Sequence, residues 1–400
     1  MRICQIVDDF PPQKGGGTLL HNQSLVDYLQ SKGHDVEVIV LRRNVKDILS
    51  FEKQSAESGY KIHNVYLKNT KFISALSWFF EIKKIIKKLE KKSKIDVFDV
   101  HNSIFIPLFF GRKANVILSL HFYELTCPVG VGRNINNAWP MPCGNFSLKK
   151  CISCVSPLNY FFWKLLRKYA IKKSTKILVK YRPMAESLTN NGINSSKIVL
   201  VPHWIDAQKI NKQTTRSEHS TFNFGFLGRL ANEKNPMLLL QAFEKLQNHY
   251  ENVRLIFVGG GALESSLKEY CVKNNISSKV KITGLLHHDD IYTELKNIDS
   301  FVFTSPYDNY GWALLEAMAT SRPIIATNVY GIKDILNNTK NALLTEQTPD
   351  SISEKMEHLL KNPVLGKIIG LNAYQTVKSR HSLKNLEKYE ELLEQFKQSH

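Results

Sequence analysis

The spacing of hydrophobic and polar positions at the start of the chain predicts a βαβ unit. A short apolar run over residues 3–7 leads into a loop rich in proline and glycine, and apolar residues then recur every three or four positions over 19–29. Gly33 ends this helical pattern, and hydrophobic residues alternate with polar ones over 36–40. This order of patterns is typical of a strand, a helix and a second strand.

The same order of patterns returns in the second half of the chain. A strand is predicted over 222–228, Pro236 stands where a helix begins, and an apolar run over 253–258 closes on three glycines. Further strands are expected over 280–283, 300–304 and 323–327, with a helical pattern between neighbouring strands. Strands that alternate with helices predict parallel sheets covered on both faces.

Two α/β units of this kind predict two doubly wound, Rossmann-like domains. The segment 206–221 is polar and weakly periodic, so we expect it to link a first domain over 1–205 to a second over 222–375. A C-terminal helix over 376–400 is expected to return toward the first domain. Ligands of such sheets bind at the carboxyl ends of the strands, so the site is predicted in a central cleft that both domains face.

The composition limits the class of protein. With 400 residues, 43% of them hydrophobic and 22% charged, the chain is typical of a globular protein and not of a disordered or fibrous one. The longest apolar stretch, over 104–110, falls far short of the ~20 residues that cross a bilayer as a helix. The opening apolar run is too short for a signal peptide, so the expected compartment is the cytoplasm.

The excess positive charge is confined to one half of the chain. The net charge is +18, with 33 lysines and arginines against 15 acidic residues over 1–215, and 21 against 21 over 216–400. One interpretation is a basic half that attracts an anionic lipid surface, a phosphate group or nucleic acid. The other is a set of solvated lysines in a chain whose composition favours Lys, Asn and Ile.

Two stretches of the basic half combine an apolar stripe with a lysine-rich face. The stripes are Ile82, Ile85, Ile86 and Leu89 in one stretch, and Leu158, Phe161, Phe162, Leu165 and Tyr169 in the other. Helices with this pattern can lie in a membrane interface, where each nearby lysine contributes about 1 kcal/mol against an anionic leaflet. A core-facing helix with a solvated lysine face has the same periodicity. Peripheral attachment to the inner face of the cell membrane and ordinary core packing therefore both stay open.

A loop in the second half has the residues of a diphosphate site. The segment 228–236 joins a strand to a helix that begins at a proline, and it places Arg229 and Lys234 within reach of one anion. Negative charge grows on the leaving diphosphate in the transition state of a group transfer. Cations that are already in place stabilise this transition state more than the ground state and so lower the activation barrier.

A second such loop lies within 301–319, where a strand, a loop with Asp308 and a helix follow one another. The backbone amides expected to bind phosphate oxygens at the positive end of this helix are those of Gly311, Trp312 and Ala313. The carboxylates of Asp308 and Glu316 would accept hydrogen bonds from sugar or ribose hydroxyls. A helix N-terminus with a stabilising acid is the plainer interpretation.

Together these segments resemble the retaining, nucleotide-sugar-dependent glycosyltransferases of the GT-B fold known as family 4, or glycosyl transferases group 1. The resemblance extends over nearly the whole chain. Its motifs are a Pro-Pro-x-x-Gly-Gly opening at 11–16, a Gly-Arg-Leu-x-x-x-Lys loop at 228–234, a Val-Gly-Gly-Gly turn at 258–261 and a Leu-Glu-Ala-Met-Ala helix at 315–319. It implies an enzyme of the hexosyltransferase type.

The resemblance assigns roles to single residues. It implies that Arg229 and Lys234 hold the donor diphosphate, that Glu316 binds the ribose hydroxyls, and that the loop before Gly311 binds the transferred sugar. Gly16 and Gly17 would let a loop of the first domain approach the donor and acceptor closely.

Two positions depart from the family pattern. Asp308 stands where the family has a glutamate, one methylene longer, and Tyr330 stands where it usually has a glycine. Both changes affect the expected sugar contact, so the identity of the donor sugar stays open.

His121 is the candidate sugar-contacting residue of the first domain. It follows the apolar run 116–120, which places it at the carboxyl end of a strand that faces the cleft. The segment 119–124 resembles the family segment whose histidine touches the transferred sugar, and a capped structural histidine is the alternative. The histidines without such support, which we expect in loops, are His101, His203, His287 and His288.

Four cysteines lie in a short segment directly after His121. They are Cys127, Cys143, Cys151 and Cys154. Four thiols, two of them in a Cys-x-x-Cys pair, could close a tetrahedral zinc site that staples a loop. Four free thiols are the alternative, since one Cys-x-x-Cys is weaker evidence than a pair of them.

The sequence contains no Asp-x-Asp triplet, so we expect no obligatory divalent metal in catalysis. The leading hypothesis is a glycosyltransferase that uses a nucleotide-sugar as co-substrate and a glycan acceptor, lipid-linked by inference from the basic half, in the synthesis of capsule, lipopolysaccharide O-antigen or a similar surface polysaccharide. A nucleotide-sugar epimerase of similar fold would need no acceptor. A basic nucleic-acid-binding protein is the alternative from another class, and no nucleic-acid-binding motif accompanies the charge.

Overall fold

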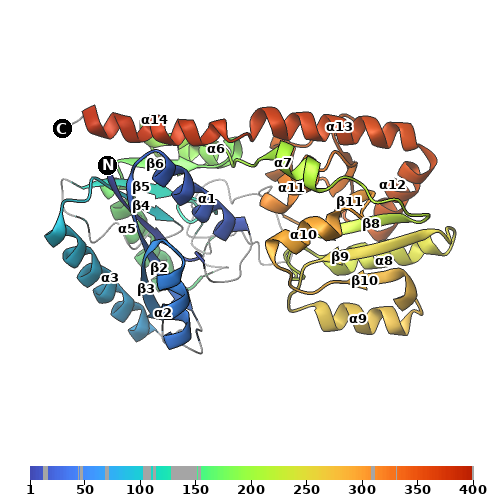
Figure 1. Cartoon of the computed structure of the whole chain (residues 1–400), viewed down its shortest axis with the longest axis horizontal. Coiled ribbons are helices and arrows are strands. Elements are labelled where there is room, and N and C mark those ends of the chain that lie inside the picture. The colour runs from blue at the N-terminus through green and yellow to red at the C-terminus, as the bar shows by residue number, and fades with distance from the viewer. Residues whose placement is uncertain are drawn as a thin grey trace. The chain divides into compact units, whose positions relative to one another are not determined.

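The computed structural model describes residues 1–11, 17–43, 45, 48–67, 72–101, 110, 114–127, 151, 155–307, 311–329 and 331–398. The chain divides into two compact units (Figure 1). The first unit comprises Met1–His203 and Asn385–His400, and the second comprises Trp204–Lys384. The chain therefore passes twice from one unit to the other.

The first unit is built on a seven-stranded parallel sheet of order β3-β2-β1-β4-β5-β6-β7. Its strands are β1 (Arg2–Val7), β2 (Asp35–Arg43), β3 (Lys61–Leu67), β4 (Val97–His101), β5 (Asn115–Ser119), β6 (Lys176–Val179) and β7 (Ile198–Leu200). Its α-helices are α1 (Gly17–Ser31), α2 (Ile48–Glu57), α3 (Phe72–Lys92), α5 (Pro157–Lys173), α6 (Arg182–Asn190) and, after its first residue, α14 (Lys384–Gln398).

The second unit contains a six-stranded parallel sheet of order β10-β9-β8-β11-β12-β13. Its strands are β8 (Phe222–Leu227), β9 (Val253–Val258), β10 (Val280–Ile282), β11 (Ser300–Phe303), β12 (Ile324–Thr327) and β13 (Leu343–Thr345). Its α-helices are α7 (Ala207–Gln213), α8 (Pro236–Gln247), α9 (Glu264–Lys273), α10 (His288–Leu295), α11 (Trp312–Ala319), α12 (Pro349–Lys361) and α13 (Pro363–Arg380).

The predicted fold class is confirmed, since both units are Rossmann-like α/β domains with parallel sheets. In each sheet the strand order reverses beside its first strand, between β1 and β4 and between β8 and β11. At such a point the loops at the carboxyl ends of the two strands lead to opposite faces of the sheet. They leave a crevice in which doubly wound domains bind ligands.

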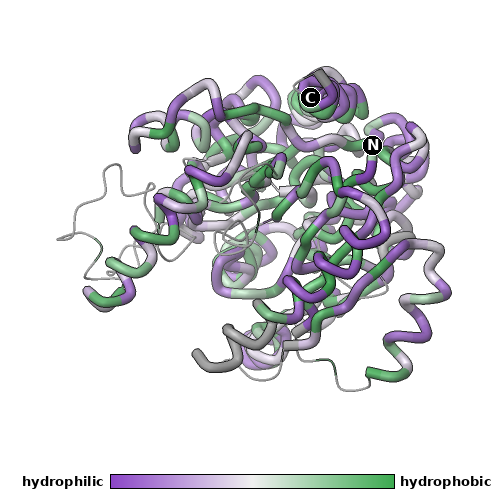
Figure 2. The backbone as a smooth tube through the Cα atoms, turned by 90° about the vertical axis from the view of Figure 1, so that its left-hand side faces the viewer, coloured by the Kyte–Doolittle hydropathy of each residue, from purple (hydrophilic) through white to green (hydrophobic). Residues whose placement is uncertain are grey.

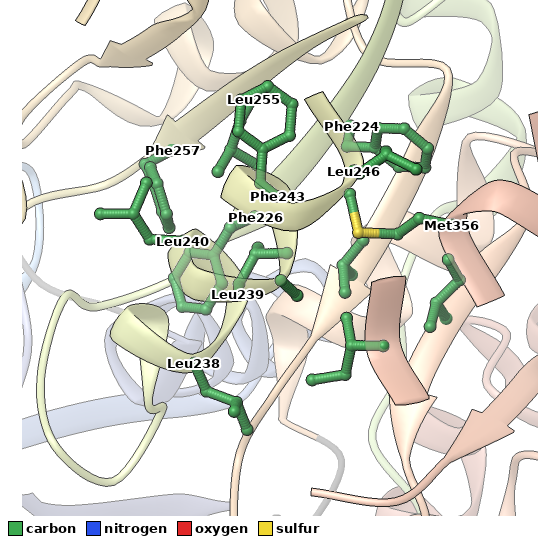
Figure 3. Packing of buried hydrophobic residues seen from close by; sticks show 14 of the residues in the cluster. Phe224, Phe226, Leu238, Leu239, Leu240, Phe243, Leu246, Leu255, Phe257 and Met356 are labelled. Atoms are coloured by element: carbon green, nitrogen blue, oxygen red, sulfur yellow. The ribbon is translucent and has the colours of Figure 1, made fainter. Parts of the chain in front are cut away.

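The core of the second unit explains why this pattern of residues folds as it does. Figure 3 shows phenylalanines of β8 and β9 packed against leucines of α8 and Met356 of α12. Phe224, Phe243 and Leu239 are fully buried. Burying a side chain of this size contributes about 1.5–3 kcal/mol, so this cluster fixes α8 against the sheet. The position of α8 in turn fixes the loop that precedes it.

The expected linker contains a helix. The carboxylate of Asp206 accepts a hydrogen bond from the backbone N–H of Lys209 (2.9 Å) and so caps α7. The side-chain amide of Asn211 donates to the carbonyl of Ala319 (3.1 Å) and to the hydroxyl of Ser321 (2.7 Å). The polar residues of this segment thus include a helix cap and a contact to the end of α11.

The two amphipathic stretches differ in the structure. Helices of this protein change repeatedly between hydrophilic and hydrophobic residues along their length (Figure 2). In α3 the apolar stripe is turned inward, with Ile82, Ile86 and Leu89 buried, which is the core-packing alternative. In α5 the stripe is exposed, and the exposed fractions are 79% for Leu158, 56% for Phe161, 46% for Phe162, 65% for Leu165 and 42% for Tyr169.

Candidate functional site

In the second unit, the loop after β8 and the turn after β9 pack backbone against backbone. The backbone N–H of Leu230 donates to the carbonyl of Gly260 (3.0 Å), and that of Gly228 donates to the carbonyl of Val258 (3.1 Å). Gly259 has a φ of +138°, and a Cβ built there would lie 2.1 Å from the carbonyl oxygen of Gly228. Glycine is therefore required at this point of the Val-Gly-Gly-Gly turn.

The same loop is tied to the end of β11, across the point where the strand order reverses. The hydroxyl of buried Thr304 lies 3.1 Å from the carbonyl oxygen of Lys234 and 2.8 Å from that of Asn235. Asn235 takes a left-handed conformation (φ +47°), and Pro236 follows as the first residue of α8. Asparagine tolerates this conformation and proline suits the first helical turn, which explains the Asn-Pro pair.

Arg229 of this loop lies at the surface, whereas Lys234 is partly buried. The guanidinium of Arg229 pairs with the carboxylate of Glu233 at 2.5 Å, and the Arg229 side chain is 70% exposed. An anion that bound here would compete with Glu233 for the guanidinium. The sequence pattern did not indicate that acidic neighbour as a partner, although the spacing of four residues is typical of such pairs.

The helix α11 brings the other predicted residues of this unit to the same edge of the sheet. Gly311 is its N-terminal cap, with extended backbone, and Trp312 and Ala313 form its first turn. Glu316, one turn in, is buried, with 5% of its surface exposed. A small, mainly apolar cavity lies beside this helix and is lined by Phe303, Ser305, Leu314, Ala326, Thr327, Val329 and Ile332. Asp308 and Tyr330 lie outside the described residues.

In the first unit, the predicted glycine opening falls partly outside the described residues. Gly16 lies outside them, whereas Gly17 is the first residue of α1. The guanidinium of buried Arg42 donates to the carbonyls of Phe10 (2.5 Å) and Pro11 (2.9 Å). This buried side chain thus holds the backbone where the Pro-Pro-x-x-Gly-Gly opening begins.

His121 follows β5 by two positions, as the sequence predicts, and it is part of a cluster of four buried histidines. His21 comes from α1, His101 ends β4, and His203 follows β7. The centroid of the His21 ring lies 4.8 Å from that of His121 and 5.4 Å from that of His203. All four rings are at most 8% exposed. Three strand ends and one helix therefore gather imidazoles at the carboxyl edge of this sheet.

A buried carboxylate, that of Asp99, contacts the histidine cluster. Asp99, on β4, accepts hydrogen bonds from the hydroxyls of Tyr389 (2.5 Å) and Ser119 (2.7 Å). The Nε2 atom of His101 lies 3.1 Å from Asp99 Oδ2, and the Nδ1 atom of His101 lies 3.1 Å from Nε2 of His121. Asp99, His101 and His121 thus form a continuous chain of polar contacts.

The electrostatics of the cluster follow from its burial. Burial, followed by the charge of Lys180, lowers the pKa values of His21 and His121 well below those of exposed histidines. Burial also lowers the pKa of Lys180 to about 7. For Asp99, burial alone would raise the pKa, but the charge of His101 and the hydrogen bonds from its three neighbours hold it below the ordinary value. These pKa directions favour an ionised Asp99 and a neutral His121.

Sequence reasoning missed most of this cluster and misplaced two histidines. His101 belongs to a strand and His288 to α10, with His287 as its cap, so the expectation of loop positions was wrong for His101 and His288. His203 does lie outside the strands, but it is buried. The available signal was that His101 and His121 each end an apolar run, which places both at one sheet edge.

The described residues include a set that could hold a metal ion. Nitrogen atoms of His21, His101 and His121 all lie within 4.8 Å of one another. Of the four cysteines expected to form a zinc site, Cys127 and Cys151 are buried. Cys143 and Cys154 lie outside the described residues, so the zinc site stays a prediction.

Comparison with known proteins identifies the class. The model of the "Glycosyltransferase Family 4" family matches residues 15–209, and that of "Glycosyl transferases group 1" matches residues 207–376. The chain is 24% identical to an uncharacterized glycosyltransferase of Methanocaldococcus jannaschii, over 97% of this chain and 96% of that one.

Two further proteins extend the comparison. Over 56% of this chain and 62% of the other, it is 26% identical to the UDP-Gal:alpha-D-GlcNAc-diphosphoundecaprenol alpha-1,3-galactosyltransferase of Escherichia coli. Its fold resembles the crystal structure of HepE of Anabaena, in complex with UDP and glucose, with a TM-score of 0.71 at 12% identity and coverage of 99% and 100%.

The two Rossmann-like units and these matches define a glycosyltransferase of the GT-B type. The family 4 model and the group 1 model match consecutive parts of the chain, and the sequence motifs resemble the same families.

None of the described helices is long and apolar enough to cross a membrane.

Proposed function

We propose that the protein transfers a sugar from a nucleotide-diphosphate donor to a lipid-linked glycan acceptor in the synthesis of a surface polysaccharide. The loop after β8, tied by Thr304 to the end of β11, is the observation that carries the donor assignment. It lies where the strand order reverses, which is where domains of this type bind nucleotides. The E. coli relative, named for a diphosphoundecaprenol acceptor, supports the lipid-linked acceptor.

The proposed chemistry needs positive charge at the leaving group. The bond between the sugar and the diphosphate breaks, the acceptor oxygen bonds to the same carbon on the same face, and the acceptor proton passes to the leaving phosphate oxygen. Arg229 and Lys234, the amides of the first turn of α11 and the dipole of that helix would stabilise the diphosphate. Glu316 would hold the ribose and Asp308 the transferred sugar, and Gly16 and Gly17 would let the loop of the first domain approach the donor and acceptor closely. No obligatory divalent metal is assigned to this step.

The donor site is tested by ligand-induced thermal shifts with UDP-, GDP- and ADP-sugars. We expect one of these classes to stabilise the wild-type chain, and Lys234→Ala and Glu316→Gln to weaken its binding at least tenfold, because a removed charged contact costs about 1.5–3 kcal/mol. Lys245→Ala, which removes an exposed partner of Asp350 in the same unit, is the control and should bind normally. Unchanged binding in both site variants would remove the donor assignment.

The transferase assignment is separated from the epimerase alternative by its dependence on an acceptor. A transferase releases nucleoside diphosphate only when an acceptor is supplied, whereas an epimerase converts the donor sugar without one. A membrane extract that contains lipid-linked glycans is the acceptor source for this assay. Conversion of the nucleotide-sugar without any extract would favour the epimerase.

We also propose that α5 attaches the protein to an anionic membrane surface. Its exposed apolar stripe lies on a helix that carries five basic residues and no acidic ones, Lys164, Arg167, Lys168, Lys172 and Lys173. Aromatic and leucine side chains on such a helix enter the lipid interface while lysines bind the headgroups. Trp163, in contrast, is buried and donates to the carbonyl of Glu124 (3.0 Å), so it stays with the core.

Membrane attachment is tested by cosedimentation with vesicles of phosphatidylcholine that contain phosphatidylglycerol. The change of Phe161 and Leu165 to Asp should reduce the bound fraction at least fivefold. The control changes Ile368 and Leu371 to Asp, which are about as exposed (50% and 56%) on α13 of the second unit. Equal losses in the two variants, or none in either, would defeat the role of α5.

The structural zinc site is the last part of the proposal. Cys127 and Cys151 are the members within the described residues, and both are buried, as ligands of a structural zinc usually are. Elemental analysis of the purified chain should find one zinc per molecule. Metal-free protein that is stably folded would reject the site.

A further inference from the structure

Buried side chains donate to three consecutive backbone carbonyls of the loop that follows β1. The side-chain amide of Asn22 donates to the carbonyl of Asp9 (2.8 Å). The guanidinium of Arg42 donates to the next two carbonyls, those of Phe10 (2.5 Å) and Pro11 (2.9 Å). Asn22 and Arg42 are both fully buried. The start of this loop is therefore held by side chains of two other elements, α1 and β2.

The sequence explains why side chains make these contacts. Pro11 and Pro12 have no backbone N–H, so the loop has few hydrogen-bond donors of its own. A carbonyl that folding shields from water and leaves without a donor is costly. Arginine has five N–H donors in a rigid, planar fork, which lets Arg42 bind two neighbouring carbonyls at once. Lysine carries the same charge but lacks this fork.

Arg42 is itself fixed by the elements around it. Its Nε donates to Oδ1 of Asn64 on β3 (2.9 Å), and its guanidinium carbon lies 4.6 Å from the centroid of the Phe51 ring on α2. The side-chain amide of Asn64 donates in turn to Glu52 and Ser55 of α2 (both 3.2 Å). A guanidinium held by a hydrogen bond and an aromatic ring loses few conformations when it binds the carbonyls.

The held carbonyls lie at the edge of the first sheet where a ligand is expected. The loop begins at the carboxyl end of β1, beside the point where the strand order reverses, and doubly wound domains bind ligands there. It leads to Gly17, the first residue of α1, and α1 also carries His21 of the buried histidine cluster. The Pro-Pro-x-x-Gly-Gly opening therefore starts from backbone that Arg42 holds and ends on a helix that Asn22 ties to the same loop.

We propose that Arg42 is a positioning residue for sugar transfer, whose fork fixes the carbonyls of Phe10 and Pro11 so that the glycine opening is held at the substrates. Arg42 touches no substrate atom in this scheme. The proposal rests on the proposed function, in which Gly16 and Gly17 let this loop approach the donor and acceptor. Loss of the fork should slow transfer more than it weakens donor binding, because the donor diphosphate is assigned to the second unit.

The test compares Arg42→Lys with a matched change at the other end of β1. Arg2 is also buried, and its guanidinium donates to the carbonyl of Leu89 (2.9 Å) and to the carboxylate of Glu37 (2.8 Å). Arg2 begins β1, whereas the loop held by Arg42 follows the last residue of that strand. Both lysine variants lose a buried fork and should lower the stability of the chain. Only Arg42→Lys should alter the reaction.

Transfer is measured with the nucleotide-sugar that binds in the thermal-shift screen and with the membrane extract as acceptor source. In Arg42→Lys we expect kcat to fall at least tenfold, while the KM for the donor changes less than threefold. In Arg2→Lys kcat should stay within twofold of the wild type. A normal kcat in Arg42→Lys, or equal losses in the two variants, would overturn the proposal, because a role in stability alone predicts no difference between them.

Hydrogen exchange of the full-length variants follows the loop without any substrate. In Arg42→Lys the amides of residues 8–10 and of the first turn of α1 should exchange at least fivefold faster than in the wild type, because the contacts that hold this backbone are lost. In Arg2→Lys the largest change should lie at the end of α3, where Arg2 donates to the carbonyls of Leu89 and Ser93. Unchanged exchange around the loop in Arg42→Lys would overturn the proposal even if kcat falls.

A second variant keeps the test decisive if Arg42→Lys does not fold. Asn64→Ala removes the oxygen that holds Nε of Arg42 and leaves the two carbonyl contacts in place. We expect its kcat to fall about two- to fivefold, because the fork is then less firmly oriented. An unchanged kcat in Asn64→Ala would reject the positioning role.

The outcomes for Arg42 and for the proposed function are distinguishable. Transfer by the wild type together with a normal kcat in Arg42→Lys rejects the positioning role and leaves the proposed function in place. Absence of transfer by the wild type from every nucleotide-sugar rejects the proposed function, and the role of Arg42 in transfer falls with it. Hydrogen exchange then still decides whether Arg42 fixes the loop.

Discussion

The carboxyl edges of the two sheets are built from different chemical groups. In the first unit the edge is lined by side chains that titrate and are buried, with His121, Asp99 and Lys180 among them. In the second unit the edge is shaped by backbone, with Gly259 closing on the carbonyl of Gly228, while the cation Arg229 stands in solvent. The proposed diphosphate ligands of the second unit, backbone amides and the exposed Arg229, therefore differ in kind from the buried side chains of the first.

In the proposed transfer reaction, the two edges would recognise different parts of the substrates. A diphosphate is recognised by amides and exposed cations, which need no fixed protonation state because arginine and the helix end are always positive. A sugar hydroxyl is recognised by a group whose donor or acceptor role must be fixed beforehand. Burial of ionisable side chains at the edge of the first unit has a cost in stability, which the exposed Arg229 of the second unit does not incur.

The largest effect is expected from the backbone packing of the second unit. Gly259→Ala places a Cβ against the carbonyl of Gly228 and forces a φ of +138° on an alanine, so we expect a loss of about 3 kcal/mol or more in unfolding free energy. Gly284→Ala is the control, because its φ is +72° and its nearest neighbour atoms lie at 3.9 Å or more. It should cost about 1–2 kcal/mol.

Urea unfolding of the full chain, followed by tryptophan fluorescence and circular dichroism, measures both variants. Similar losses in Gly259→Ala and Gly284→Ala would mean that the close approach of the two turns is not required. The contrast between the edge of the second unit, shaped by backbone, and that of the first unit, lined by side chains, would then not hold.

The second prediction concerns the buried charge of the first unit. The pKa of Lys180 falls from 10.5 to about 7 on folding, so the unfolded chain binds more protons than the folded chain between these pH values. Stability therefore rises as the pH increases from about 7 toward 10, by up to about 1.4 kcal/mol per pH unit. Below pH 7 both states are protonated, and the cost of burial is constant.

Lys180→Met should remove this slope and raise the stability at pH 7, since methionine is buried without charge. Lys176→Met is the control at the start of β6, the strand that Lys180 directly follows, and its ammonium group donates to the carbonyl of Ser196 in an exposed position. Free energies of unfolding measured at pH 7, 8 and 9 test both variants. A slope that persists in Lys180→Met would show that another group is responsible.

The same contrast explains what the sequence could and could not predict. The turns of the second unit are local, since Gly228, Arg229 and Lys234 lie within seven residues and Gly259 follows one strand, so their spacing is visible in the chain. The strands around them were predicted within one or two residues, because both faces of a parallel sheet are buried and its strands are continuous apolar runs.

The histidine cluster could not be predicted in this way. His21, His101, His121 and His203 come from four separate segments, and Tyr389 from a fifth, so only the strand order brings them together. His121 alone stood out, through its apolar run and its resemblance to a family segment. Segment 206–221 illustrates another limit: its polar residues include a helix cap and a side-chain contact to α11, which composition does not distinguish from a linker.

The smallest effect is expected from the exposed pair of Arg229 and Glu233. Both side chains are substantially exposed, at 70% and 37%, and surface ion pairs contribute about 0–1 kcal/mol. Glu233→Gln should therefore change the unfolding free energy by less than about 0.5 kcal/mol.

If Arg229 binds the donor diphosphate, removal of its competing carboxylate should tighten donor binding about two- to fivefold, and this gain in affinity should be largest at low salt. Glu264→Gln removes a similar exposed partner, that of Lys268, and should alter neither quantity. Donor titrations at low and high ionic strength measure the difference, and weaker binding in Glu233→Gln would indicate that the carboxylate positions the arginine and does not compete for it.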